Sequence, residues 1–192
     1  MNAFEQICTR IDALLAQKSH VLVAIDGPAA SGKTTLAAKL AAHFGAQVLH
    51  MDDYFLQPYQ RMPERYAQPG GNVDRERFLA EALQPLSRGD TYVSRRFDCG
   101  SMTLLEGKTV EPTELVIAEG SYSLHPELAA YYDLRVLLRI APDKQSARIL
   151  ARNGAEKHAQ FMTRWIPLEN RYFEATDIEA RCDLQLTVEE EA

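Results

Sequence analysis

Residues 27–34 read Gly-Pro-Ala-Ala-Ser-Gly-Lys-Thr and match every position of the pattern G-x-x-x-x-G-K-[ST]. A short apolar run, His20 to Asp26, precedes the pattern and is typical of a buried parallel strand. An Ala- and Leu-rich stretch, Thr34 to Phe44, follows it and predicts a helix. In the order strand, glycine loop and helix, this pattern indicates a phosphate-binding loop. The feature therefore constrains the chain to an α/β fold, and a chance glycine-rich turn is the weaker interpretation.

The loop chemistry follows from its glycines and from the helix behind it. Gly27 and Gly32 let the backbone curl so that successive N–H groups point at one phosphate, and the helix adds its positive end. Lys33 can bridge the β- and γ-phosphates, and the Thr34 hydroxyl can bind Mg²⁺. ATP and Mg²⁺ are the expected cofactors. The predicted nucleotide-binding residues are Gly27, Pro28, Ala29, Ala30, Ser31, Gly32, Lys33, Thr34 and Thr35.

Length and charge narrow the class of protein. The 192 residues fit a single domain over 1–192, and the net charge of −6 argues against nucleic acid as a partner. Three widely spaced cysteines favour reduced thiols in a cytoplasmic protein. No apolar run approaches the length of a membrane span, so we expect no membrane partner. A homo-oligomer is compatible with the sequence.

Apolar periodicity predicts strands that alternate with helices. We expect further strands at 47–51, 115–118, 134–140 and 184–188, helices at 3–18, 74–87 and 156–173, a helix from Pro142 that Gly154 stops, and a polar ribbon from 91–97 and 107–110. This order predicts a three-layer P-loop NTPase fold, with a parallel sheet flanked by helices. A small lid is expected at roughly 142–173, with acceptor-binding insertions at roughly 54–74 and 91–112.

Two carboxylates follow predicted strands, at the sheet edge where α/β proteins bind ligands. Asp52 follows the second strand and is the candidate base that orients and deprotonates a substrate hydroxyl. Glu119 ends the strand at 115–118 and is the candidate for the Mg²⁺ shell, through water. The alternative for both residues is a cap or turn role. Asp26 precedes the loop, and for it a structural role is favoured.

Arginines supply the remaining candidate groups of the phosphate site. Arg148 and Arg152 are four residues apart on one helix face and could clamp the transferring oxygens as part of a lid, unless that face is only solvated. Whether Arg164 and Arg171 reach the site is left open. Phe161 and Trp165 are interpreted as core residues, and the histidines show no metal-ligand spacing. The candidate acceptor-binding residues are Asp52, Tyr54, Arg61, Arg96 and Asp98.

The assembled pattern resembles the phosphoribulokinase/uridine kinase family of P-loop kinases. The resemblance rests on residues 25–35, Met51-Asp52-Asp53-Tyr54-Phe55, Phe97-Asp98, Ile117-Ala118-Glu119-Gly120 and Ala147 to Arg152, and it spans roughly 20–188. It implies a catalytic aspartate at Asp52 and lid arginines at Arg148 and Arg152. The acceptor half departs from the uridine kinase pattern, at Gln68 to Asp74, at Phe97 to Met102 and at Asn153 to Lys157.

The leading hypothesis is an ATP-dependent kinase that phosphorylates a hydroxyl of a small metabolite, a nucleoside such as uridine or a similar riboside. The alternative is a nucleotide-hydrolysing switch or regulatory ATPase with a protein partner. A guanine-reading Asn-Lys-x-Asp segment and a transporter-type Leu-Ser-Gly-Gly-Gln segment are both missing from the sequence, which favours the kinase. The choice between ATP and GTP and the identity of the acceptor are not determined at this level.

Overall fold

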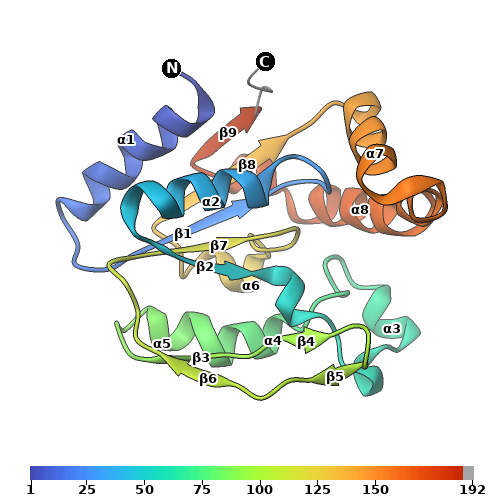
Figure 1. Ribbon diagram of the computed structural model, residues 1–192, viewed down its shortest axis with the longest axis horizontal. Helices are drawn as coiled ribbons and strands as arrows, with labels where there is room; N and C mark the ends of the chain where they lie inside the picture. Colours follow the sequence, from blue (N-terminus) through green and yellow to red (C-terminus); the bar gives the residue numbers. More distant parts are fainter. Residues whose placement is uncertain (188–192) are drawn as a thin grey trace.

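A five-stranded parallel sheet with the order β2-β7-β1-β8-β9 forms the centre of the computed structural model, which describes residues 1–187 (Figure 1). All four strand pairs are parallel. The strands are β1 (Val21–Asp26), β2 (Gln47–His50), β7 (Leu115–Glu119), β8 (Leu134–Arg139) and β9 (Leu184–Thr187). The five predicted strands are confirmed, except that Val188 lies outside the described residues.

The side chains of β1 pack alternately into two separate hydrophobic cores, one on each face of the sheet. Val21, Val23 and Ile25 pack on one side with helices α1 (Ala3–Leu15) and α2 (Lys33–Phe44). Leu22 and Ala24 face the other side, where the core includes residues of α4, α8 and α9. Because both faces are covered, every residue of β1 is buried, as expected for a central parallel strand. The three-layer P-loop fold predicted from the sequence is therefore confirmed.

The segments between β2 and β7 form a substructure beneath the sheet in Figure 1. Asp74 begins the helical stretch over 75–86, and its side chain accepts from the Arg77 N–H at 3.1 Å, as predicted for an N-cap. Strands β3 and β6 pair antiparallel and confirm the polar ribbon; β4 and β5 form a second hairpin that was not predicted. The elements here are η1 (Met51–Tyr54), η2 (Pro58–Gln60), α3 (Pro63–Tyr66), α4 (Arg75–Phe78), η3 (Leu79–Leu83), α5 (Gln84–Leu86), β3 (Tyr92–Ser94), β4 (Phe97–Asp98), β5 (Thr103–Leu104) and β6 (Lys108–Val110), and α6 (Pro126–Ala129) follows β7.

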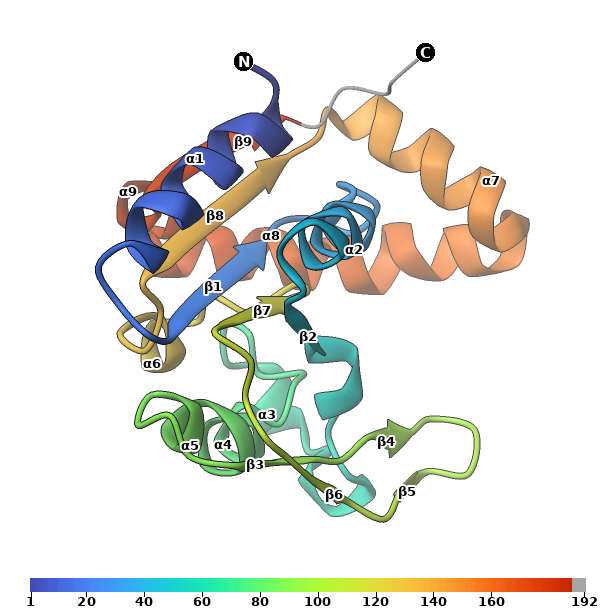
Figure 2. The same cartoon turned by 60° about the vertical axis from the view of Figure 1, so that its left-hand side comes forward.

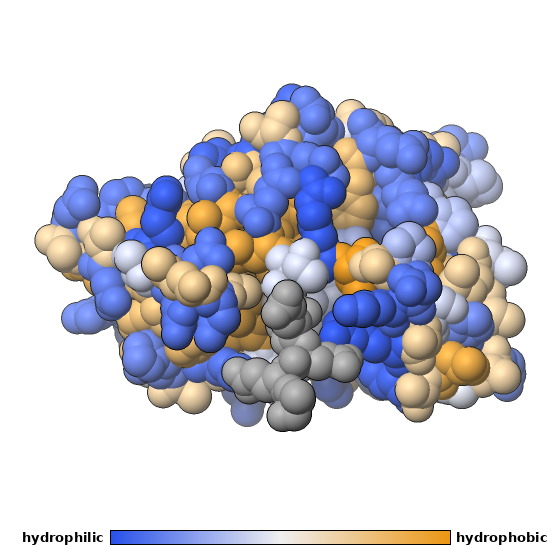
Figure 3. All heavy atoms as spheres, turned by 90° about the horizontal axis from the view of Figure 1, so that it is seen from above, coloured by the Kyte–Doolittle hydropathy of each residue, from blue (hydrophilic) through white to orange (hydrophobic). Residues whose placement is uncertain are grey.

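Helix α7 (Pro142–Gln160) leaves the end of β8 and projects from the sheet, and the chain returns through η4 (Phe161–Trp165) and α8 (Ile166–Thr176) to α9 (Ile178–Arg181) (Figure 2). Gly154 has φ 77° and ψ 171°, so the helix is interrupted there as predicted and then resumes. Glu169 and Tyr172 on α8 are buried, which anchors the end of the expected lid segment in the core. Seen from above, the surface mixes hydrophilic and hydrophobic residues (Figure 3). Within residues 1–187, no helix combines the length and apolar character that a membrane crossing needs.

Candidate active site

The phosphate-binding loop sits between the end of β1 and the start of α2. Gly27 and Gly32 have φ values of 149° and 98°, which L side chains rarely adopt. A Cβ atom at Gly27 would lie 2.5 Å from the Leu138 carbonyl oxygen of the neighbouring strand. Glycine is therefore required at this position both by the backbone angle and by the close approach of β8.

Lys33 lies across the loop that contains it. Its Nζ donates to the carbonyl oxygens of Gly27 and Pro28 at 2.8 and 2.9 Å and to Ser121 Oγ at 3.4 Å. The side chain is largely buried, so its position is set by these acceptors and not by solvent. An ammonium group fixed in this way supplies the positive charge that a phosphate chain in the loop needs.

Asp26 supports the base of the loop. Its Oδ1 accepts from the N–H groups of Gly27 (2.6 Å) and Tyr122 (3.1 Å), and its Oδ2 accepts from Leu124 N (2.9 Å) and the Tyr172 hydroxyl (2.8 Å). Complete burial raises the pKa of Asp26, while the donors of Leu124, Tyr172 and Gly27 and the charge of Lys33 oppose that rise. Four donors leave no lone-pair direction free for a proton, so the geometry fits an ionised carboxylate with the structural role favoured from the sequence.

Thr34 and Glu119, the two residues predicted to hold Mg²⁺, lie together. Thr34 Oγ1 is 3.2 and 3.1 Å from the two Glu119 carboxylate oxygens. Oxygen ligands of this kind suit Mg²⁺, which usually keeps several waters and substrate phosphates in its shell. Within the described residues, no group of three or more His, Cys, Asp or Glu could hold a metal alone. The residues thus fit a Mg²⁺ ion that is shared with a triphosphate.

His50 is a site residue that sequence reasoning missed. Its Nδ1 lies 2.6 Å from Glu119 Oε1, and this hydrogen bond raises the pKa of His50. The contact arises because β2 and β7 are in register at His50 and Glu119. A histidine as the last residue of the strand before Asp52 was the available signal, but the strand neighbour was needed to interpret it.

Asp52 follows β2 directly, in the single turn η1. It lines a cleft of about 1470 Å³ together with Lys33, Thr34 and Glu119, so these four predicted residues share one cavity. Asp52 is solvent-exposed and lines the cleft, although the atoms of the cleft walls partly desolvate its carboxylate. Burial, and then the negative charge of Glu119, raise the pKa of Asp52, and the charge of Lys33 lowers it. A carboxylate with a raised pKa beside a phosphate site is a suitable proton acceptor.

Helices α7 and α8 contact the loop through the side chains of Gln145, Arg148 and Glu169. Arg148 donates to the Ala30 carbonyl at 3.1 Å, and it lines the cleft together with Arg152. Both backbone polar groups of Ala29 are hydrogen-bonded. Gln145 Nε2 donates to the Ala29 carbonyl at 3.0 Å, and the Ala29 N–H donates to Glu169 Oε2 at 2.9 Å. Sequence reasoning missed Gln145 and Glu169, since neither residue belongs to a recognisable motif.

The other predicted acceptor-binding residues lie outside the cleft lining. Tyr54 is 2% exposed and packs in the core under the Arg77 guanidinium, so its hydroxyl is not presented to the cleft. Arg61 donates to the Leu56 carbonyl and lies over the Phe97 ring. Asp98 accepts from Gly100 and Ser101 within its own hairpin. Arg96 lies near Asp53 and Asp98, and its positive charge acts to lower the pKa of both carboxylates.

Other side chains complete the lining of the cleft. Phe161 and Trp165, interpreted from the sequence as core residues, are half-buried and line this cavity, which corrects that interpretation. Arg164 and Arg171 are not in the lining; Arg164 lies over the rings of Tyr66 and Trp165, and Arg171 donates to the Tyr66 carbonyl. Besides the phosphate-loop residues, the lining includes Asp52, Phe55, Asn72, Val73, Tyr122, Phe161, Trp165 and Glu169.

Solved structures with the same arrangement cover nearly the whole chain. A "putative fructose transport system kinase" from Silicibacter sp. TM1040 is 25% identical and has a TM-score of 0.76, with 96% of this chain and 99% of that chain covered. This is the fold of the P-loop kinases. The P-loop kinase fold is also shared with a "possible uridine kinase" from Bacillus stearothermophilus, at 23% identity and a TM-score of 0.68 over 94% of this chain and 99% of that one. Uridine kinase-like P-loop kinases are thus among the structural neighbours.

Curated relatives match shorter stretches of this P-loop kinase-fold chain. Uridine-cytidine kinase C of Dictyostelium discoideum is 28% identical over 123 residues, which is 63% of this chain and 27% of that protein. A cytidylate kinase of Bradyrhizobium sp. is 32% identical over 100 residues, 51% of this chain and 45% of that protein. The chain therefore spans less than half the length of each curated relative it matches here. No family model matches the chain.

Proposed function

We propose that the protein is a small-molecule kinase that uses ATP and Mg²⁺ to phosphorylate a hydroxyl group. One observation carries the proposal: Lys33, Thr34, Glu119 and Asp52 line one cleft on a P-loop kinase fold. The four similar proteins named above, two of them as possible or putative kinases, support the same reaction class.

Each residue of the site has a separate role in such a phosphate transfer. The loop N–H groups and Lys33 would bind the triphosphate. Thr34 and Glu119 would hold Mg²⁺, which would supply neutralisation of the phosphate charge. Arg148 and Arg152 approach from α7 to stabilise the charge of the transferring group. Asp52 orients the acceptor hydroxyl and takes up its proton. The domain is proposed to extend over 1–192, with a lid at roughly 142–173 and acceptor-side insertions at roughly 54–74 and 91–112.

The charge distribution of the cleft favours an uncharged acceptor. Its cationic lining residues within the described chain, Lys33, Lys39, Arg148 and Arg152, lie on the loop, α2 and α7. Near Asp52, the proposed acceptor side would present the Asp52 carboxylate, the Asn72 amide and aromatic rings. Burial, and then the negative charge of Glu119, raise the pKa of Asp52, which supports a cost for further negative charge beside this carboxylate. An anionic acceptor would add to this cost, so we propose a nucleoside such as uridine or a similar riboside.

The test is substrate-dependent release of ADP from Mg-ATP. Uridine, cytidine and other ribosides form the neutral panel, and cytidylate and glycerate form the anionic panel, with the product identified by mass spectrometry. Asp52→Asn should lower turnover of the active acceptor at least 100-fold and leave a small residual rate, whereas Asp183→Asn, a change at the β8–β9 edge, should not. Turnover of anionic acceptors alone would contradict the acceptor class. No turnover with either panel would reject the kinase proposal.

A further inference from the structure

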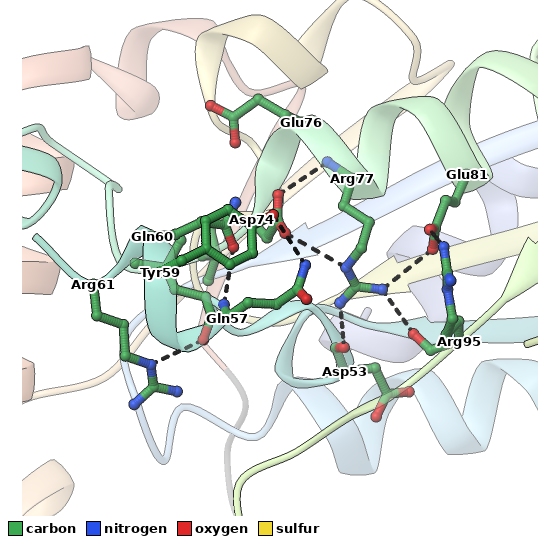
Figure 4. Close-up of polar contacts among 12 residues, drawn as sticks. Asp53, Gln57, Tyr59, Gln60, Arg61, Asp74, Glu76, Arg77, Glu81 and Arg95 are labelled. Atoms are coloured by element: carbon green, nitrogen blue, oxygen red, sulfur yellow. Dashed lines mark hydrogen bonds and ion pairs between the residues drawn. The ribbon is translucent and has the colours of Figure 1, made fainter. Parts of the chain in front are cut away.

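Arg77 lies on α4, only 8% of it is exposed, and its guanidinium points toward Asp53, the residue that follows Asp52 (Figure 4). We propose that Arg77 is a positioning residue that holds η1 (Met51–Tyr54) and thereby places the Asp52 carboxylate in the cleft. This inference rests on the proposed function only in the role it gives Asp52. Whether Arg77 fixes the turn does not depend on that role and can be tested separately.

The contacts fall on the two residues that follow Asp52. Arg77 NH2 donates to the Asp53 carbonyl at 2.7 Å, and the guanidinium carbon lies 4.2 Å from the centre of the Tyr54 ring. The N–H of Asp74, the residue that caps α4, donates to the Tyr54 carbonyl at 2.7 Å. Two consecutive carbonyls of the turn are therefore fixed to the start of one helix, which limits the backbone rotations that would move Asp52.

Arg77 is itself held in place by surrounding acceptors, as Figure 4 shows. Its NH1 lies 3.2 Å from Glu81 Oε2 and donates to the Arg95 carbonyl at 2.8 Å, and its Nε is 3.6 Å from Asp74 Oδ2. Glu81 also pairs with the Arg95 guanidinium. The buried charge is thus compensated by two carboxylates, and a planar guanidinium reaches all these partners at once. A lysine has one nitrogen and cannot bridge Asp53, Glu81 and Arg95 together.

The opposite side of the turn is closed by the end of β7. Gly120 has φ 136°, and a Cβ atom there would lie 2.7 Å from Met51 Cβ. Met51 is therefore pressed against the residue that follows Glu119, while Asp53 and Tyr54 are tied to α4. The turn is fixed between the magnesium-binding end of the sheet and Arg77, so the loss of Arg77 frees one side only. Asp52 is then displaced while the phosphate loop stays intact.

The variants Arg77→Met and Arg77→Lys test this role, with Arg135→Met as the matched control. Arg135 also forms a charged pair, with Asp183 at 2.9 Å, but on the β8–β9 edge of the sheet. Hydrogen–deuterium exchange of the 51–56 segment should rise in both Arg77 variants and stay unchanged in the control. With the active acceptor, kcat should fall by about 100-fold in Arg77→Met, because small displacements of a reacting group have effects of that size, and the KM for ATP should stay within about threefold.

A combined variant separates positioning from general destabilisation. If Arg77 acts through Asp52, adding Arg77→Met to Asp52→Asn should lower the residual rate no further. Unchanged exchange at 51–56 in either folded Arg77 variant would overturn the proposal, and so would a further loss of rate in the double variant. Urea midpoints establish which variants fold. If Arg77→Met does not fold, the exchange of Arg77→Lys, which keeps the charge, decides the proposal. If the wild type phosphorylates no acceptor, the kinase proposal fails, and exchange alone still decides whether Arg77 holds the turn.

Discussion

Replacing Asp26 by asparagine should destabilise the protein, because the change alters an acceptor that serves four donors. An asparagine amide can turn its oxygen toward Gly27 and Tyr122, which leaves its NH₂ group facing Leu124 N–H and the Tyr172 hydroxyl. The hydroxyl can rotate and accept, but the Leu124 N–H cannot. The best arrangement of Asp26→Asn therefore leaves one buried backbone donor without an acceptor.

The size of the effect follows from this count. An unsatisfied buried donor costs about 1–3 kcal/mol, and the remaining hydrogen bonds lose their charge assistance. Removing a buried charge recovers part of the loss, since burial raises the pKa of Asp26. We expect a net destabilisation of about 2 kcal/mol. Tyr172→Phe removes one donor and leaves the carboxylate with three, so it should cost about 1 kcal/mol.

Urea denaturation followed by circular dichroism measures both changes. With a slope of about 2 kcal/mol per molar urea, Asp26→Asn should lower the midpoint by about 1 M and Tyr172→Phe by about half as much. The double variant should lose less than the sum, because both changes affect the same hydrogen bond. An Asp26→Asn variant as stable as the wild type would show that Asp26 is protonated in the native state, and the reasoning from four donors would then be refuted.

Three further predictions concern the loop, the metal and pH. Gly27→Ala should abolish Mg-ATP binding in calorimetry, because its Cβ would meet the Leu138 carbonyl at 2.5 Å, whereas Gly45→Ala, where no atom lies within 4 Å, should retain binding; equal affinities would contradict this. Glu119→Gln should raise the Mg²⁺ concentration for half-maximal activity at least tenfold, and an unchanged Mg²⁺ titration would remove Glu119 from the metal shell. Burial and the charge of Arg75 lower the pKa of His125, so the unfolded chain binds this proton more readily and stability should fall as pH drops below about 6.5. Urea midpoints of His125→Gln at pH 7.5 and 5.5 should differ less than those of the wild type, and an equal difference would contradict this origin of the pH dependence.

The sequence by itself determined the loop, the sheet and the side of the sheet on which the site lies. The loop is a contiguous segment whose geometry depends on its own glycines, and the apolar run that predicts β1 is a local pattern. Asp52 and Glu119 were found because parallel strands end at a common edge, so a residue that follows a strand is placed by the fold class alone. The break at Gly154 was predictable because it depends on the glycine at that position alone.

Only the tertiary structure decided which side chains complete the cleft. His50 meets Glu119 across 69 residues and Glu169 reaches Ala29 across 140, contacts that depend on strand register and on the return of α8. Tyr54 was predicted to bind the acceptor but is buried in the core against Arg77, 23 positions later, whereas Trp165 was assigned to the core but lines the cleft. Side-chain direction in turns and irregular helices follows from packing between distant segments, and no short pattern encodes that packing.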